Sequence, residues 1–218
     1  EGLFGKVTQV TTTKELMDDE TLAKLDIDCV VLKHTDEECK RIKKYTYAEE
    51  LNYIVSHTKR NKFIENLCKT IKGNTLVLFQ LVDKHGVLLH NEIKKLDKKV
   101  FFVYGGTTTE TREKIRGIVE KEKDSLIIAS YGTFSTGINI RNINNIVFAS
   151  PSKSKIRVLQ SIGRGLRKME NKSVVRLFDI ADNASYKSRQ NFTYRHFTER
   201  LNIYKGENFN YKVSRVNL

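Results

Sequence analysis

Short apolar runs and helical patterns alternate along most of this chain. Val, Ile, Leu and Phe dominate runs at residues 75–80, 100–104, 126–129, 146–149 and 174–178. Between the first two runs, Val82, Leu89, Ile93 and Leu96 recur at helical spacing and share one side. Apolar strands that alternate with helices are typical of a parallel sheet covered on both faces. The pattern therefore predicts an α/β fold with a largely parallel sheet flanked by helices, whose ligand sites gather beyond the carboxyl ends of the strands.

Helix-start signals surround one further strand in the first part of the chain. The pattern T-x-x-E is typical of a capping box, and it occurs at Thr12/Glu15, Thr35/Glu38, Thr46/Glu49 and Thr107/Glu110. We expect helices at residues 12–18 and 46–55, a strand at 27–32, and a later helix from about residue 109 to 121. The acidic run at residues 36–38 resembles a magnesium-binding pair. Three residues separate it from the strand, however, so we interpret it as the first turn of a helix.

Two short stretches carry the most specific chemistry. Residues 135–139 read STGIN, and residues 160–167 read QSIGRGLR. In the second stretch Gln160, Gly163, Arg164 and Arg167 share one helical face beside an apolar stripe. Glycine costs about 1 kcal/mol relative to alanine inside a helix, so its presence indicates a close backbone approach. Two arginines at such a point favour a phosphate ligand, although this motif alone also fits an ordinary amphipathic helix with a solvated basic side.

Taken in order, four motifs resemble the second motor domain of superfamily-two helicases and translocases, in which two RecA-like domains hold ATP between them. The matching segments are residues 75–80 for the first core strand, Gly105 with Arg112 for the G-x6-R element, residues 130–139 for the T-G-x-D motif, and residues 160–167 for the arginine-finger motif Q-x-x-G-R-x-x-R. The whole chain is similar to recombination helicases of T-even bacteriophages, of which it would be the carboxyl-terminal half. The resemblance implies ATP-dependent remodelling of single-stranded or branched DNA, in recombination and repair.

The resemblance also implies a role for each matched residue. Arg167 would be the arginine finger, Arg164 its phosphate-binding or coupling neighbour, and Gln160 the residue that orients both. Gly137 and Asn139 would lie against the nucleotide. Asn139 departs from the Asp of many members, which keeps a hydrogen-bond acceptor and loses the charge. Contacts to the DNA backbone would come from Gly105, Thr107, Arg112 and Ser130.

The chain contains no G-x-x-x-x-G-K-[ST] motif, because Gly5-Lys6 precedes Val7 and no other Gly precedes Lys. We therefore expect ATP and Mg²⁺ to be held mainly by the first RecA-like domain of the same protein, and we expect no ATPase activity from this chain alone. Its first residue is Glu rather than Met, which we interpret as the mark of a fragment or a processed product.

Positive charge is concentrated in the last third of the chain. Residues 153–218 contain 15 Lys and Arg against 5 Asp and Glu, whereas residues 1–152 contain 24 against 21. In this tail aromatic residues are interleaved with cations, which suits DNA binding. Arg189 and Arg200 are the predicted DNA contacts. We expect both, together with His196, to face solvent. The aromatic residues themselves have helical spacing that favours packing on the core, namely Tyr194, Phe197, Leu201 and Tyr204. The basic run at residues 40–44 indicates only a solvated face or a linker.

Length and composition fit one α/β core with extensions. The chain has 218 residues, of which 39% are hydrophobic. We expect three parts: a leading segment at residues 1–58 that packs on the core, a RecA-like motor domain at 59–182, and a basic helical and strand tail at 183–218. The three cysteines lack C-x-x-C spacing and no apolar run reaches about 18 residues, which predicts a cytoplasmic protein with no membrane partner and no metal site. A duplex translocase that does not unwind and a non-catalytic nucleic-acid-binding module remain as alternative functions.

Overall fold

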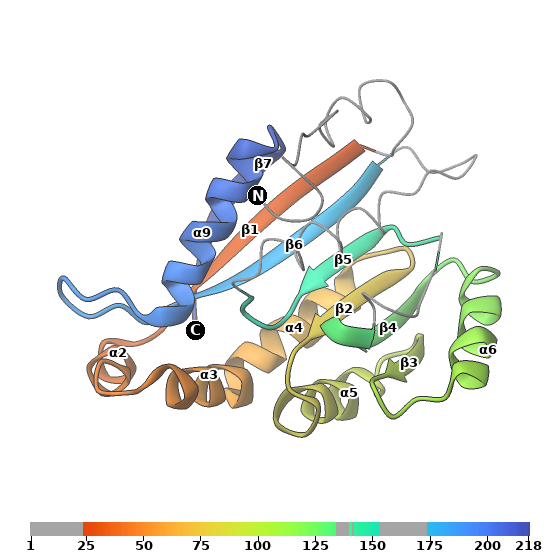
Figure 1. Ribbon diagram of the computed structural model, residues 1–218, viewed down its shortest axis with the longest axis horizontal. Helices are drawn as coiled ribbons and strands as arrows, with labels where there is room; N and C mark the ends of the chain where they lie inside the picture. Colours follow the sequence, from red (N-terminus) through yellow and green to blue (C-terminus); the bar gives the residue numbers. More distant parts are fainter. Residues whose placement is uncertain (1–23, 134–139, 141, 153–173) are drawn as a thin grey trace, which may run out of the picture.

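The computed structural model describes residues 24–133, 140, 142–152 and 174–218. Its described strands form one seven-stranded sheet with the order β3-β4-β2-β5-β6-β1-β7 (Figure 1). Every neighbouring pair is parallel, so the predicted parallel sheet is confirmed. The strands are β1 Lys24–Lys33, β2 Thr75–Phe79, β3 Lys99–Val103, β4 Ser125–Ser130, β5 Asn145–Phe148, β6 Val174–Asn183 and β7 Asn210–Asn217.

Helices cover both faces of this sheet, as the apolar patterns predict. The described helices are α2 Asp36–Ile42, α3 Tyr47–Ser56, α4 Thr58–Thr70, α5 Val87–Ile93, α6 Thr109–Val119 and α9 Phe192–Gly206, with a π-helical turn η1 at Val82–Gly86 that leads into α5. On one face α4 and α5 bury Ile64, Cys68, Leu89 and Ile93 against the sheet. On the other face α6 and α9 do the same with Ile115, Val119, Phe197 and Tyr204. Within the described residues, none of these helices combines the length and the apolar character that a membrane crossing requires.

The first and last strands complete the sheet of the central segment. β1, from the predicted leading segment, pairs along its whole length with β6, from Lys24↔Val174 to Lys33↔Asn183. β7, from the predicted tail, pairs with the other edge of β1. Residues far apart in the sequence therefore share one core, in which Leu25, Ile27 and Cys29 of β1 lie under α9.

Two of the predicted capping boxes are present and one is wrong. Thr35/Glu38 caps α2 and Thr46/Glu49 caps α3, each with both reciprocal hydrogen bonds. Thr107/Glu110 does not cap α6, because the hydroxyl of Thr107 accepts the N–H of Tyr104 in the preceding turn, and Thr108 is the N-cap residue. The Thr12/Glu15 pair lies outside the described residues.

The aromatic face of α9 packs as predicted. Phe197 and Tyr204 are buried in the core, and Tyr194 and Leu201 pack against them. β6 is longer than the predicted strand at 174–178, because it continues through two carboxylates that are fully buried, Asp179 and Asp182. Burying a charge is costly unless it is paired, and here buried arginines neutralise both carboxylates.

Candidate motor site and nucleic-acid interface

The carboxyl ends of all seven strands lie along one edge of the sheet, since all are parallel. Gly105 follows β3 and Ser130 ends β4, so the predicted DNA contacts come from two adjacent strands. Only β2 separates β4 from β5. With neighbouring strands about 4.8 Å apart, the ends of β4 and β5 are roughly 10 Å from each other. The two segments that carry the STGIN and QSIGRGLR motifs therefore leave the sheet close together at this edge.

The loop after β3 is a compact turn held by its own side chains. Thr107 Oγ1 accepts the N–H of Tyr104 at 3.1 Å, and the N–H of Thr107 donates to the Tyr104 carbonyl at 2.9 Å. Arg112 of α6 donates through Nη2 to the carbonyls of Tyr104 and Gly105, at 3.4 Å each. Gly105 and Gly106 are exposed, and their N–H groups donate no hydrogen bond within the described part of the chain. The turn can therefore offer backbone donors to a phosphate oxygen while Arg112 holds its carbonyls.

Ser130 lies at the same edge but is committed to local structure. It is only 9% exposed, and its hydroxyl lies 2.8 Å from the hydroxyl of Thr133 and accepts the N–H of Thr133 at 3.3 Å. The side chain thus caps the turn that follows β4. A contact between Ser130 and DNA would have to share this hydroxyl with Thr133.

The remaining predicted site residues, Gly137, Asn139, Gln160, Arg164 and Arg167, lie outside the described residues. The chain that leads to the last three is described up to Ser152, and its backbone is held at three carbonyls between Ala149 and Ser152. Arg60 Nη2 donates to Ala149 O at 2.7 Å, Tyr131 Oη donates to Ser150 O at 3.2 Å, and Arg200 Nη1 donates to Ser152 O at 2.9 Å. The loop after β5 is therefore fixed from several elements just before the predicted arginine-finger segment.

Arg200 corrects the sequence prediction. Its side chain is 1% exposed and forms a forked pair with Asp179, with Nε and Nη2 donating to the carboxylate at 2.8 and 2.7 Å. Tyr204 Oη donates to the same carboxylate at 2.8 Å. Burial lowers the pKa of Arg200, but the charge of Asp179 outweighs it and raises that pKa above its ordinary value. The expected solvent exposure of Arg200 is wrong, and its guanidinium is not available to DNA.

A second buried arginine, which no sequence motif indicates, lies on the other face of the sheet. Arg60 of α4 is fully buried, and its Nε donates to both oxygens of Asp182 at 2.9 and 3.0 Å. Burial raises the pKa of Asp182, but the Arg60 charge and the contact with His34 outweigh it, so the pKa is lowered. Each carboxylate at the end of β6 is thus neutralised by an arginine, which leaves neither free to hold Mg²⁺.

Comparison with known proteins places the chain in a family. Residues 58–169, more than half of the chain, match the model of the helicase conserved C-terminal domain. The chain belongs to this helicase family. It is 37% identical, over its whole length, to the ATP-dependent DNA helicase UvsW of enterobacteria phage T4, and it spans 46% of that protein. The chain thus spans less than half the length of this curated relative.

Solved structures agree with this assignment. The crystal structure of T4 UvsW matches 90% of this chain and 42% of that chain, with 36% identity and a TM-score of 0.78. The C-terminal domain of the DEAD-box protein Dbp5 has a similar fold at 14% identity, with a TM-score of 0.55 over 91% of this chain and 92% of that one. The RecA-like fold that the motifs imply is therefore confirmed.

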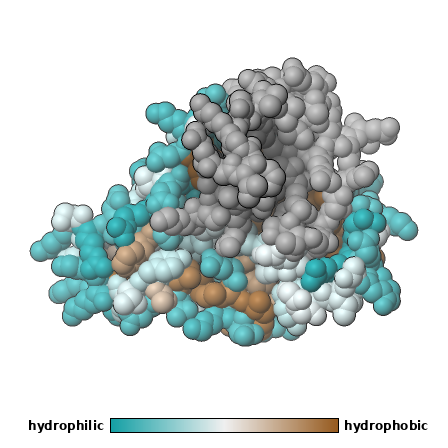
Figure 2. All heavy atoms as spheres, in the orientation of Figure 1, coloured by the Kyte–Doolittle hydropathy of each residue, from teal (hydrophilic) through white to brown (hydrophobic). Residues whose placement is uncertain are grey.

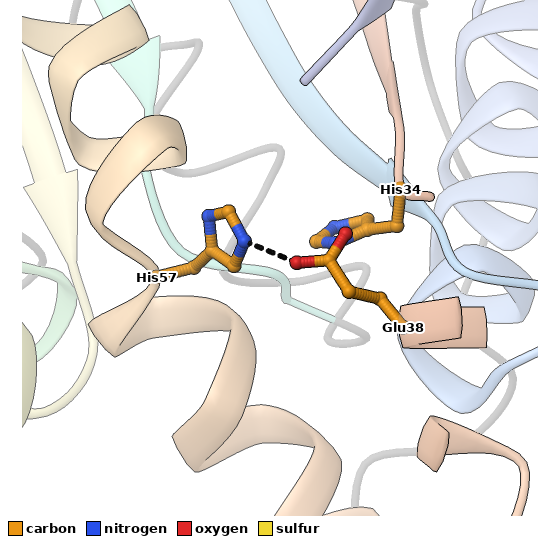
Figure 3. A group of neighbouring side chains, drawn as sticks. All are labelled: His34, Glu38 and His57. Atoms are coloured by element: carbon orange, nitrogen blue, oxygen red, sulfur yellow. Dashed lines mark hydrogen bonds and ion pairs between the residues drawn. The ribbon is translucent and has the colours of Figure 1, made fainter. Parts of the chain in front are cut away.

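The chain also brings together His34, Glu38 and His57, whose ligand atoms lie within 4.8 Å of one another (Figure 3). His57 caps α4, and its Nδ1 accepts the N–H of Arg60 at 3.2 Å. The ring proton therefore lies on Nε2, which donates to Glu38 Oε1 at 2.8 Å. A metal ion would need the lone pair of that same Nε2. We therefore interpret the cluster as a hydrogen-bond network that joins α2, α3 and α4.

Glu38 is the centre of this network. Its carboxylate accepts from His57, from the hydroxyl of Tyr53 at 2.8 Å, and from the backbone and side chain of Thr35 at 2.9 Å each. Burial raises the pKa of Glu38, but the hydrogen bonds from His57, Thr35 and Tyr53 outweigh it and lower the pKa to about 2. The ionised form of Glu38 thus stabilises the packing of α2 against α3 and the start of α4.

We expect Glu38→Gln to lower the free energy of unfolding by about 1 to 2 kcal/mol at neutral pH, since an amide cannot accept all four bonds and the site keeps some solvent contact. The folded pKa lies below the unfolded value of about 4.3, so this stabilisation is complete above that pH and is lost as pH falls towards 2. Urea unfolding of both proteins across this window would show the difference shrink. Glu49→Gln is the control, because Glu49 occupies the same capping position on α3 and its carboxylate accepts hydrogen bonds from Thr46 alone among the described residues.

Proposed function

We propose that this chain is the carboxyl-terminal motor half of an ATP-dependent DNA helicase that remodels branched DNA, with Arg167 as the arginine finger. The observation that carries the proposal is the convergence of the predicted nucleotide and DNA segments at one edge of the sheet. The STGIN and QSIGRGLR segments follow β4 and β5, and the exposed Gly105-Gly106 turn follows β3. The printed name of the T4 relative, an ATP-dependent DNA helicase, supports the same activity.

In this proposal the chain contributes charge stabilisation rather than the phosphate cradle. Hydrolysis of a γ-phosphate depends mostly on positioning and on neutralising charge in the transition state. ATP with Mg²⁺ supplies the chemistry when the first RecA-like domain is present. Arg167 and Arg164 would approach its phosphates from this side, with Gln160 orienting them and Gly137 and Asn139 beside the nucleotide. The fixed loop after β5 supports such a role, since a rigid start limits where the following segment can point.

The DNA track in this proposal runs over the loops after β3 and β4. The N–H groups of Gly105 and Gly106, with Thr107, Arg112 and Ser130, would contact phosphates and not base edges, so binding would tolerate any sequence. Closure of the two RecA-like domains on ATP and their opening after hydrolysis would move this track along DNA. Remodelling can be tested directly by incubating the intact protein with ATP and a four-way DNA junction. If ATP drives no conversion of the junction, the branched-DNA part of the proposal is wrong.

We expect the isolated 218-residue chain to show no DNA-stimulated ATP turnover above background, because it lacks the Gly-rich cradle for the triphosphate. Phosphate release would be measured with and without DNA, beside the intact protein as a positive control. Arg167→Ala in the isolated chain identifies contamination, since a contaminating ATPase would be unaffected by it. Robust turnover that DNA stimulates and that Arg167→Ala abolishes would refute the division of labour between the two halves.

A further inference from the structure

Two segments more than 140 residues apart form one patch of cations and aromatic rings. Its members lie in the α2–α3 turn, in the loop between β6 and α9, and at the start of α9. The ring of Tyr186 lies below Lys43 Nζ at 5.4 Å and Lys187 Nζ at 5.8 Å. The ring of Phe192 lies below the guanidinium carbons of Arg189 at 5.8 Å and Arg195 at 4.8 Å. We call these six residues the cation–aromatic patch: Lys43, Tyr186, Lys187, Arg189, Phe192 and Arg195.

The fold holds both halves of the patch in place. Cys39 and Ile42 of α2 are buried with Ala184, and Tyr186 packs against them. Glu50 of α3 reaches the start of α9, where it accepts the N–H of Phe192 at 2.9 Å and the N–H of Thr193 at 2.7 Å. This carboxylate therefore occupies the amino end of α9, so any external anion at this place must be bound by side chains. Figure 1 shows α2 and the loop before α9 together at one end of the molecule.

The four cations of the patch are exposed and have no acidic partner. Lys43, Lys187, Arg189 and Arg195 are all exposed, and none forms an ion pair with a carboxylate in the part of the chain that the structure describes. Surface cations elsewhere do form such pairs, for example Lys95 with Glu92 and Lys114 with Glu110. This end of the molecule is accordingly mostly hydrophilic in Figure 2. An uncompensated positive surface of this kind fits a polyanion.

We propose that the cation–aromatic patch binds the phosphate backbone of DNA beyond the motor track, an inference that rests on the proposed function. Each ring already carries two cations of its own, so the rings hold cations in position rather than stack on bases. A guanidinium has five N–H donors, so one held beside a ring can still donate to a phosphate. The patch therefore suits contacts that are insensitive to sequence and sensitive to salt.

The position of the patch fits a continuous nucleic-acid path. It follows β6 and β1, while the proposed track follows β3 and β4, at the same edge of the sheet. Three strand spacings separate β4 from β6, which is about 14 Å, or roughly four base pairs at 3.4 Å each. A duplex that leaves the track along this edge in the direction of β6 and β1 would run towards the patch. Both segments of the patch lie outside residues 58–169, the part that matches the helicase model.

The test removes the four charges by substitution, because α9 and β7 belong to the core and cannot be truncated. We expect Lys43→Ala, Lys187→Ala, Arg189→Ala and Arg195→Ala, combined in the 218-residue chain, to weaken binding to a mixed-sequence duplex. The slope of log affinity against log salt should become shallower by about 3 to 4, since each lost phosphate contact contributes about 0.9. Phe192→Leu keeps every charge but frees Arg189 and Arg195, so it should weaken binding with a smaller change in slope.

A charge-matched control separates this surface from a general effect of net charge. Lys59 and Lys69 of α4, Lys94 at the end of α5 and Lys123 after α6 are exposed, belong to none of the elements that form the patch, and form no ion pair within the described residues. Replacing these four with Ala should change the slope much less. Equal slopes for the two quadruple variants would overturn the proposal. A patch variant that binds DNA like the wild type would overturn it as well, and would mean that the patch binds an acidic protein surface or no partner. Arg112→Ala reports on the motor track separately, so its failure to weaken binding would count against the proposed function and not against the patch.

Discussion

Replacing Arg167 with Ala should reduce ATP turnover by the intact protein by about 10³-fold or more, while the affinities for ATP and DNA change much less. An arginine finger contacts charge that develops in the transition state, so its loss acts on turnover rather than on ground-state binding. Steady-state turnover with saturating DNA, together with equilibrium binding of a non-hydrolysable nucleotide, would separate the two effects. Arg167→Lys should restore little, because a single ammonium group cannot reproduce the planar fork of guanidinium donors.

Lys168→Ala provides the matched control for that experiment. Lys168 is the neighbouring cation, and on the predicted helix its side chain points about 100° away from that of Arg167. Its removal should leave turnover within a few-fold of the wild type. Near-normal turnover in Arg167→Ala, with the fold intact by circular dichroism, would remove the catalytic assignment. Residues 160–167 would then be an ordinary basic amphipathic helix, the alternative that the motif alone leaves open.

Most of the fold is predictable from the sequence because each central strand is a short apolar run between helical patterns. β2, β4 and β5 are completely buried, and their sequences contain no charged residue to interrupt the signal. The order of the strands is not predictable in the same way. β1 lies between β6 and β7, and the register of those pairs depends on contacts between residues about 150 positions apart. Local periodicity contains no information on such pairings.

The buried ion pairs show where the prediction of the site failed and why. Arg200 was expected on the solvent face of α9, yet it follows Phe197 by three residues and precedes Tyr204 by four, which places it on the buried face. Arg60 precedes the buried Ile64 of α4 by one turn in the same way. Helical spacing could have located both arginines. Their partners could not be chosen from the sequence. Asp179 and Asp182 lie three residues apart on β6, so their side chains point to opposite faces of the sheet and meet helices on opposite sides.

The cation–aromatic patch cannot be predicted from the sequence for a related reason. The basic run at residues 40–44 indicates only a solvated face when it is taken alone, and the tail aromatics were expected to pack on the core. Packing does account for Phe197 and Tyr204. Tyr186 and Phe192 instead lie beneath cations, and one of those cations, Lys43, comes from the other end of the chain. The patch exists only because β1 and β6 are neighbours.

We expect Arg200→Met to lower the free energy of unfolding by about 3 to 5 kcal/mol, because it leaves Asp179 as an uncompensated charge in the core. Asp179 is fully buried, and without Arg200 its remaining side-chain donor is Tyr204 among the described residues. The loss is a large part of the 5 to 15 kcal/mol that a typical domain has in total. Urea unfolding of the 218-residue chain would measure it.

The double variant Arg200→Met with Asp179→Leu tests the cause of that loss. If the cost comes from the unpaired carboxylate, removing the carboxylate as well should recover much of the stability, and the two substitutions should be strongly non-additive. Arg195→Ala on the exposed side of the same helix should change stability by no more than about 0.5 kcal/mol. Additive losses in the double variant would instead mean that Arg200 stabilises the fold through Ser152 O and through its own packing. In that case the main role of Arg200 is to hold the loop after β5 and not to neutralise Asp179.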